Sequence, residues 1–267
     1  MSIDLVFFII SYFTIIFSIL GYGSFFSKFA NQDNIECLGY KGLIGIFILI
    51  LYSYISHLFY KHSLVHNSII IILGLVFFLH KKAKISFTDI RNVFLIFSII
   101  LVGFFIFKTH DDFPYYHFPY TYHLTQNFLT TGIGQINHGF RTPSSIFYLN
   151  SLSYLPFIKY YMFHIGTLAI LGFSNLILLN YVFIYLKKKK FDFLFFFILL
   201  IFCFINIFFY RLQEHGTDRS AQILIFILFI NLFLLRDIKT DISKTFTLLI
   251  ILFSLIVSLK SFYFLYL

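Results

Sequence analysis

Polar and apolar residues along this chain fall into long blocks. Eight apolar runs follow one another, and most are separated by short loops rich in lysine and arginine. A helix needs roughly 20 apolar residues to cross about 30 Å of hydrocarbon, and it satisfies its own backbone groups within lipid. The pattern therefore predicts an all-α fold, a polytopic transmembrane helical bundle of about eight spans. The runs cover residues 3–20, 43–60, 66–79, 92–107, 161–186, 192–210, 220–235 and 245–267.

Composition agrees with a membrane solvent, because 60% of the residues are hydrophobic and 12% are charged. Such a chain cannot hide its apolar surface in a water-soluble core. A net charge of +9 would suggest a nucleic-acid partner if the protein were soluble. Here the basic residues lie in loops between the spans, where membrane orientation explains them. We therefore expect contact with membrane lipid and none with nucleic acid.

The loops between the runs differ in basic charge. Alternate loops hold 13 lysine and arginine residues in one set and 6 in the other. The positive-inside rule places the richer set in the cytoplasm, so the polar loop 108–160 and the segment 211–222 are expected on the outer face. The richer set comprises Lys28, Lys41, Lys81, Lys82, Lys84, Arg91, Lys187 to Lys190, Arg236, Lys239 and Lys244, and the poorer set comprises Lys61, Lys108, Arg141, Lys159, Arg211 and Arg219.

We expect residues 1–267 to form a single membrane domain, with 108–160 as an outer-face polar loop that carries interfacial helices. The last apolar run reaches Leu267 without a polar flank. Because such flanks usually anchor membrane helices, we expect the chain to be an N-terminal fragment of a longer protein. A natural C-terminus at the outer boundary is the alternative.

Two adjacent carboxylates, Asp111 and Asp112, stand just beyond the fourth apolar run. One of them could cap a short helix that begins near Phe113 or Pro114. Capping explains one aspartate and not the pair, and ionisable groups at a membrane edge tend to mark functional sites. A carboxylate within hydrogen-bond reach of a sugar hydroxyl can take its proton, so either aspartate is a candidate general base.

The run FPYYHFPYTYHLTQNFL, which starts at Phe113, favours a helix lying in the membrane interface. Tyr116, Tyr120, Leu124 and Phe128 recur at intervals of four, and tyrosine is a common interface residue. This stripe fits a membrane anchor better than a platform for stacking sugars. Pro119 is expected to kink or interrupt the helix.

Histidines in the same run raise the question of a metal. His117 and His123 are about one and a half helical turns apart, so they cannot share a face as a simple His-x3-His pair would. Binding of a divalent cation by Asp111, Asp112 and His117 is one interpretation of these residues. The alternative for each histidine is a local hydrogen bond at the interface.

The stretch TGIGQINHGFRTPSS combines three glycines with Asn137, His138 and Arg141. Glycines allow a backbone to fold closely over a ligand, and arginine pairs with phosphate through its forked donors. An ordinary turn whose arginine meets lipid phosphate is the alternative. The stretch lacks the GxxxxGK[ST] pattern of a P-loop.

A second acidic segment, RLQEHGTDRSAQ, places Glu214 and Asp218 four residues apart. On a helix the two would share a face, although Gly216 between them favours a loop or a helix start. A salt bridge with Arg211 or Arg219 is the alternative to a functional role. Lys260 lies about 15 residues into the last run, and it is expected near the outer boundary, where it could reach the same cleft or the headgroups.

Three motifs, in this order, carry a resemblance to a known group. HDDFPYYH, then GIGQINHGFR with SSIFYLNSL, then EHGTD are similar to a largely uncharacterised family of bacterial polytopic membrane proteins. That family is usually grouped near the GT-C superfamily of glycosyltransferases, which the arrangement of an outer acidic motif, an interfacial helix and further spans also resembles. The similarity covers roughly residues 101–260. One departure is that the acidic loop of GT-C enzymes follows the first span, whereas here it follows the fourth.

The resemblance implies transfer of a sugar from a polyprenyl-phosphate-linked donor to a cell-envelope glycan, lipid or protein at the outer face of a bacterial inner membrane. It implies Asp111 or Asp112 as the catalytic base. The resemblance does not decide whether a divalent cation is the cofactor. The residues expected to bind substrate are His110, Tyr116, His117, His123, Gln126, Asn137, His138, Arg141, Glu214, Asp218, Arg219 and Lys260.

Two other functions stay open. A polysaccharide polymerase or ligase also works on lipid-linked glycans, but such enzymes often depend on several outer arginines, and this chain offers Arg141, Arg211 and Arg219 there. A lipid-linked glycan transporter or flippase is expected to carry ionisable residues deep in its spans and an inverted repeat. The apolar runs here are almost free of charge, which favours the transferase.

Overall fold

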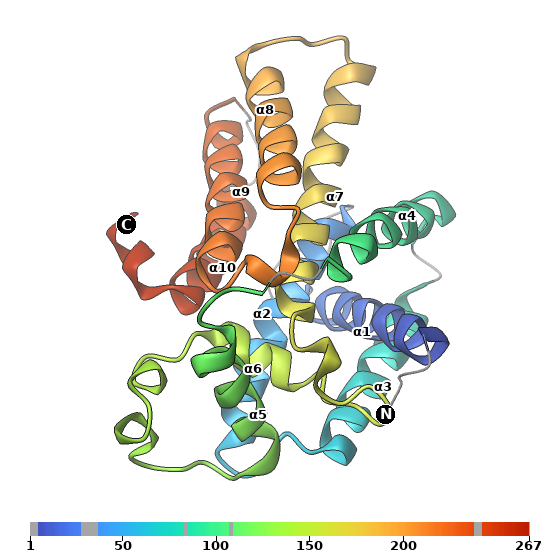
Figure 1. Cartoon of the computed structure of the whole chain (residues 1–267). Helices are drawn as coiled ribbons and strands as arrows, with labels where there is room; N and C mark the ends of the chain where they lie inside the picture. The colour runs from blue at the N-terminus through green and yellow to red at the C-terminus, as the bar shows by residue number, and fades with distance from the viewer. Residues whose placement is uncertain (1–4, 28–36, 83–84, 107–108, 238–241, 267) are drawn as a thin grey trace.

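The computed structural model is all-α, and it describes residues 5–27, 37–82, 85–106, 109–237 and 242–266 (Figure 1). Lys28, Lys84, Lys108, Lys239 and Leu267 from the sequence predictions lie outside these ranges. The α-helices are α1 Leu5–Phe26, α2 Leu38–His57, α3 Leu64–Lys82, α4 Phe87–Phe104, α5 Phe118–Gln126, α6 Ser145–Ser151, α7 Ile165–Lys187, α8 Phe193–Phe208, α9 Asp218–Asp237 and α10 Ile242–Leu259.

Each of the eight predicted apolar runs contains a helix, which confirms a polytopic helical membrane protein. Within the ranges that the structure describes, five helical stretches are long and apolar enough to cross a membrane, whereas three apolar helices are shorter. The longer ones are Leu5–Phe26, Leu38–His57, Phe87–Phe104, Tyr160–Lys187 and Asp218–Leu235, and the shorter ones are Leu64–His80, Phe193–Phe208 and Phe246–Leu259.

Glycines bring α1, α2 and α3 into close contact. A Cβ atom on Gly21 would stand 1.9 Å from the carbonyl oxygen of Gly74 on α3, and one on Gly23 would stand 1.7 Å from that of Lys41 on α2. Small residues allow backbones to approach in this way in membrane bundles, where lipid gives little hydrophobic drive for helix association.

Buried polar side chains tie α7 to its neighbours. Asn175 of α7 and Asn206 of α8 exchange hydrogen bonds of 3.2 and 2.7 Å. Tyr40 of α2 donates to the amide oxygen of Asn231 on α9 at 2.8 Å, and its hydroxyl lies 3.1 Å from that of Tyr181 on α7. Hydrogen bonds of this kind between helices help to hold membrane bundles together.

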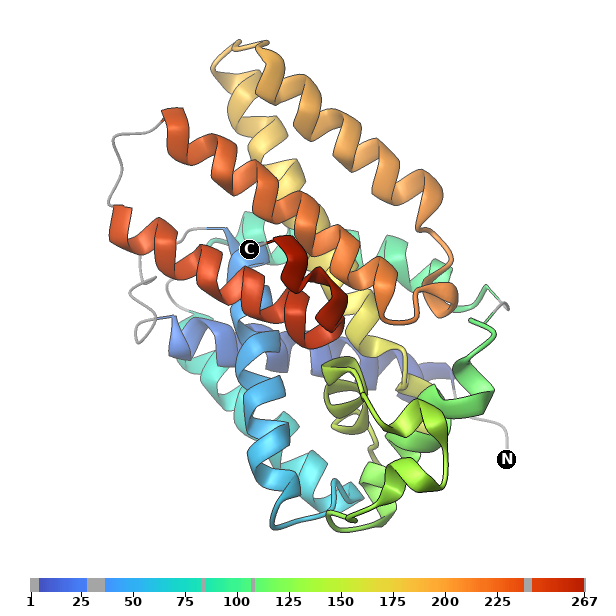
Figure 2. The same ribbon diagram turned by 90° about the vertical axis from the view of Figure 1, so that its left-hand side faces the viewer.

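The segments predicted to face outward meet at one end of the bundle. The turn after α2 reaches α5, because the His62 amide donates to the Leu124 carbonyl at 3.0 Å. The end of α10 reaches α6, where the Ser144 hydroxyl donates to the Leu259 carbonyl at 2.7 Å. In both views the polar loop lies opposite the tip of the α7–α8 hairpin, where the KKKK cluster is found (Figures 1 and 2).

Two predicted helices differ from the structure. The last run is not one helix to residue 267, because α10 ends at Leu259 and a short 3-10 helix, Ser261–Tyr266, follows. The helix predicted from Phe113 is divided into a π-helical turn, η1 Phe113–His117, and α5. Two members of its stripe, Tyr120 and Leu124, turn inward and are 6% and 1% exposed, whereas Phe128 is 60% exposed.

Candidate functional site

The π-helical turn after α4 positions the first group of polar side chains. Pro119 has no amide hydrogen, so it cannot donate to the Tyr115 carbonyl four residues earlier. The Asn137 side-chain amide donates to this carbonyl instead, at 2.8 Å. Asn137, predicted to bind substrate, therefore holds the turn in shape. π-Turns inside helices are frequently found at functional sites.

Asp112 occupies the N-cap position of η1, but its side chain makes no capping hydrogen bond. Its Oδ2 accepts a hydrogen bond from the Tyr116 hydroxyl at 3.1 Å and lies 3.7 Å from Nδ1 of His110. The capping alternative is therefore wrong for the Asp112 carboxylate. Asp111 is exposed, and it makes no hydrogen bond or ion pair with the described residues.

His110 and His117 complete this group, which we call the His–Asp cluster (His110, Asp112 and His117). The two imidazole rings stack with their centroids 5.4 Å apart. Nδ1 of His110 accepts a hydrogen bond from the Asp112 backbone amide at 3.1 Å. Each of the three residues offers one atom that could bind a metal ion, and these atoms lie within 4.8 Å of one another.

Burial shifts the pKa of His117 and of its neighbour Tyr116. It lowers the pKa of His117 to about 4, with a smaller contribution in the same direction from His110, so the imidazole is neutral at pH 7. Burial, followed by the charge of Asp112, raises the pKa of Tyr116 to about 12, so its hydroxyl stays protonated and can donate to the carboxylate. Nε2 of His117 is buried without a hydrogen-bond partner among the described residues.

The second acidic segment forms the turn between α8 and α9 and packs against the cluster. The His110 amide donates to the Gln213 carbonyl at 2.9 Å. Gly216 has a φ of +53°, which favours glycine. A Cβ atom there would lie 3.2 Å from Cδ2 of His110 and 3.4 Å from Cε1 of His117, so glycine also leaves room for both rings.

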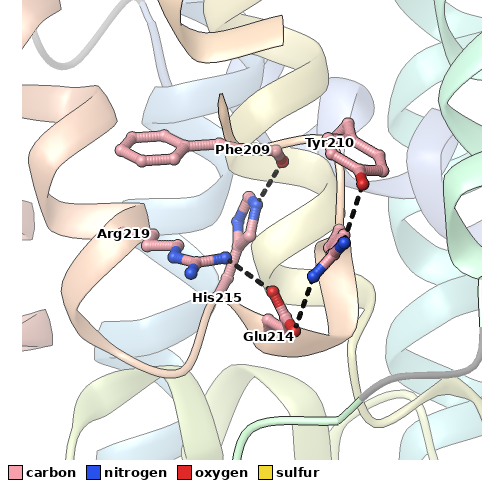
Figure 3. A network of polar contacts seen from close by, with 6 residues as sticks. Phe209, Tyr210, Glu214, His215 and Arg219 are labelled. Atoms are coloured by element: carbon pink, nitrogen blue, oxygen red, sulfur yellow. Dashed lines mark hydrogen bonds and ion pairs between the residues drawn. The ribbon is translucent and has the colours of Figure 1, made fainter. Parts of the chain in front are cut away.

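Glu214 is engaged by two arginines, which agrees with the salt-bridge alternative. Its side chain is 12% exposed, and its oxygens lie 3.4 Å from Arg211 and 3.3 Å from Arg219 (Figure 3). In the same turn, Nε2 of His215 donates to the Phe209 carbonyl at 2.6 Å. These contacts hold the turn that carries Gly216 in place. Glu214 and Arg219 therefore support the site by stabilising this turn.

Asp218 and Lys260 bring the ends of two more helices to the cluster. Nζ of Lys260 lies 2.8 Å from Oδ1 of Asp218, and the side chains are 44% and 53% exposed. Both charges act on the pKa of His117, Asp218 raising it and Lys260 lowering it. The site therefore joins three parts of the chain that are remote in sequence.

The remaining predicted residues make contacts of their own. Gln126 bonds to neighbouring Thr125 at 2.8 Å, and His123 lies 3.2 Å from the Thr130 hydroxyl. Arg141 donates to the Gly134 carbonyl at 3.3 Å, and His138 is exposed beside it. These four side chains make no hydrogen bond or ion pair with the His–Asp cluster.

The glycine-rich loop nevertheless lies against the cluster. A Cβ atom on Gly139 would stand 2.4 Å from Cγ of Tyr116, so the glycine allows the loop to cover that ring. Gly139 is held in turn by Asn137, whose side-chain oxygen accepts from its amide at 2.9 Å. The loop therefore forms one wall of the site through its backbone.

A buried group that sequence analysis missed lies between α2, α3 and α6. Ser56 and Ser151 bracket the His62 ring at 3.1 and 2.6 Å, and burial lowers the pKa of His62 to about 3. The amide nitrogen of Asn67 lies within 3.0 Å of three carbonyl oxygens, including that of Ser151. The available signal was the spacing of histidines in ISHLFYKHSLVHN, which reads at first as an ordinary loop.

A small cavity of about 20 Å³ borders the cluster on its inner side. His164 at the start of α7 lines it and stacks on Phe113 with the ring centroids 4.3 Å apart. The cavity is also lined by His117, Asn150 and Gln213. Polar side chains therefore extend from the cluster toward the helical bundle.

Comparison with known proteins identifies the family of this chain but assigns it no function. No curated protein and no solved structure matches the chain. The sequence model of one family, described as a domain of unknown function (DUF8201), matches residues 5–267. Since this match covers nearly the whole chain, the protein belongs to the DUF8201 family.

Proposed function

We propose that this protein is a GT-C-type glycosyltransferase that moves a sugar from a polyprenyl-phosphate-linked donor to a cell-envelope glycan, lipid or protein. The observation that carries the proposal is the meeting of carboxylates and a cation from remote segments at one end of a membrane bundle. Asp111 and Asp112 come from the segment after α4, Asp218 from the start of α9 and Lys260 from the end of α10. Ionisable groups gathered at a membrane edge tend to mark functional sites.

The reaction needs a base and a stabilised leaving group. A carboxylate takes the proton of the acceptor hydroxyl while its oxygen attacks the anomeric carbon of the sugar. The bond between that carbon and the phosphate oxygen breaks, and polyprenyl phosphate leaves with the bonding electrons. Asp111 suits the base, because its exposed side chain is free of described partners.

The phosphate group is expected to meet the cations at the edge of the site. Lys260 is nearest to the carboxylates and remains 44% exposed although it pairs with Asp218. Arg141, exposed in the adjoining loop, can bind a phosphate oxygen through a second donor group. Positive charge placed where negative charge develops on the leaving group lowers the barrier.

Orientation and span number form part of the same proposal. We infer eight membrane-crossing segments, with the His–Asp cluster on the outer face of a bacterial inner membrane. The meeting of the outward-predicted segments at one end of the bundle supports this orientation. The three shorter apolar helices would cross where the bilayer adapts to them.

The test is transfer by the purified protein in liposomes, with a panel of polyprenyl-phosphate and polyprenyl-pyrophosphate sugars and release of the lipid product as the readout. Replacing Asp111 and Asp112 together with asparagine should lower the rate by about 10²- to 10⁴-fold, the usual contribution of a general base. Of the two single variants, Asp111→Asn should show most of this loss in transfer rate.

Asp192→Asn is the matched control for this experiment. Asp192 caps α8 by accepting from the Phe195 amide at 3.0 Å, and asparagine caps equally well. The control should therefore keep the wild-type rate. Full activity in the double variant, or no transfer by the wild-type protein from any donor of the panel, would show that the proposal is wrong.

A further inference from the structure

We propose that the His–Asp cluster binds one divalent transition-metal ion of the zinc type. The inference depends on the ligand atoms alone and holds whatever reaction the site catalyses. Two imidazoles and one carboxylate form a donor set that suits Zn²⁺ and related ions rather than Mg²⁺ or Ca²⁺, which prefer oxygen ligands. Three protein ligands would leave a coordination position open, as in catalytic zinc sites.

The spacing of the ligand atoms is close to that of a bound ion. Donors of a tetrahedral site with bonds of about 2.1 Å stand about 3.4 Å apart. Nδ1 of His110 and Oδ2 of Asp112 already lie 3.7 Å apart, and all three ligand atoms lie within 4.8 Å of one another. The His110 and Asp112 side chains are 39% and 47% exposed, so both have room to rotate toward an ion.

His117 is the most buried of the three proposed ligands. Its side chain is 6% exposed, its ring packs on Phe147 with centroids 4.9 Å apart, and Nε2 is buried without a partner among the described residues. A buried polar atom that makes no hydrogen bond destabilises the folded protein, because its loss of hydration is not compensated. A metal ion would remove this cost, and the local hydrogen bonds of His110 and Asp112 do not.

The other two ligands are held by their neighbours. Nδ1 of His110 is unprotonated, because it accepts from the Asp112 amide, and binding of an ion through this atom would replace that hydrogen bond. The Tyr116 hydroxyl orients the Asp112 carboxylate at 3.1 Å, as outer-shell donors do in known metal sites. Tyr116 is therefore a positioning residue.

Charge around the cluster also suits a cation. Among the described residues, Lys260 is a positive group near the cluster, and Asp218 pairs with it at 2.8 Å. Asp111, exposed beside Asp112, adds a second negative charge. If Asp112 holds the ion, then Asp111 is the carboxylate left for proton transfer, which sharpens the choice between the two aspartates.

Isothermal titration of the purified full chain with ZnCl₂ tests the inference, with a purification tag that contains no histidine. The wild-type protein should bind one equivalent. His110→Ala, Asp112→Asn and His117→Gln should each weaken binding by about 100-fold or more, since losing an outer-shell partner alone costs about 10- to 100-fold. Tyr116→Phe should weaken it by about 10-fold.

His123→Ala and His138→Ala are the matched controls, because these histidines lie in the same polar loop and outside the cluster. Both should bind Zn²⁺ as the wild-type protein does. If His117→Gln fails to fold, His110→Ala still decides, since the His110 side chain is 39% exposed and that of His117 is buried. X-ray absorption of the zinc complex should show two imidazoles with Zn–N distances of about 2.0 to 2.1 Å.

Three results would overturn the inference. They are the absence of stoichiometric binding, equal losses in the control and cluster variants, and wild-type affinity in His110→Ala and Asp112→Asn. These measurements use no sugar substrate. A negative zinc result would therefore not contradict the transfer proposal, and a negative transfer result would not contradict zinc binding.

Discussion

Replacing Gly21 with valine should destabilise the protein by about 3 kcal/mol or more. A Cβ atom at this position would stand 1.9 Å from the Gly74 carbonyl oxygen and 2.8 Å from the Phe78 amide nitrogen, both of which are backbone atoms of α3. Rotation of a side chain cannot relieve these contacts, so α1 and α3 must separate. Insertion of extra atoms into a packed core usually costs about 1 to 3 kcal/mol, and the backbone contacts here favour the upper end.

Thermal unfolding in detergent, followed by circular dichroism, measures this loss. Ile10→Val on the exposed face of the same helix is the control, because its side chain is 56% exposed and should give no measurable change. Wild-type stability in Gly21→Val would mean that α1 and α3 do not pack as described. Valine has a higher helix propensity than glycine, so a loss of stability in Gly21→Val would come from packing and not from propensity.

Asn67→Leu should cost about 3 kcal/mol and should also disturb the His–Asp cluster. Asn67 is fully buried, and its amide nitrogen lies within 3.0 Å of the His62, Ser151 and Tyr154 carbonyl oxygens. Leucine would leave buried acceptors without a donor, and each such group costs about 1 to 3 kcal/mol. The effect should reach the cluster through α6, because Phe147 of that helix packs on His117.

Thermal unfolding and zinc titration together measure both consequences of Asn67→Leu. The expected result is a lower melting temperature and weaker zinc binding. Asn127→Leu is the matched control, since Asn127 is exposed at the end of α5 and bonds to His123 outside the cluster. A fully stable Asn67→Leu protein would contradict the assigned role of this residue.

Much of the fold could be predicted from the sequence, because lipid imposes a simple rule on length and hydrophobicity. Each of the eight apolar runs holds a helix, although three of these apolar helices have 17 residues or fewer among the described residues. The break at Pro119 was predicted as well. The inward turn of Tyr120 and Leu124 was not, because a stripe at intervals of four describes a packed helix as well as an interfacial one.

The site was predictable in part, since its residues interrupt the apolar pattern. Sequence alone could not decide which of them meet, because those contacts depend on helix packing. Asn137 appeared to be a ligand-binding residue, but its partner is a carbonyl left free by a proline. Glu214 was expected to bind substrate or to form a salt bridge, and the structure pairs it with two arginines.

The buried group around His62 and Asn67 shows a second limit. His62 falls in the short loop between two predicted spans and Asn67 near the start of the second span, and no local pattern marks either residue as buried. They are buried because α5 and α6, far along the chain, cover that loop. Burial by remote elements is not encoded in local spacing.

The most direct test of the central claim is the membrane side of the two polar segments that form the site. Single cysteines at positions 111 and 217 would be introduced after Cys37 and Cys203 are replaced by serine, and intact bacteria would be labelled with a membrane-impermeant maleimide. Both positions should react in intact cells, whereas a cysteine at position 188 should react after permeabilisation only. Labelling of positions 111 and 217 from opposite sides would contradict a shared site.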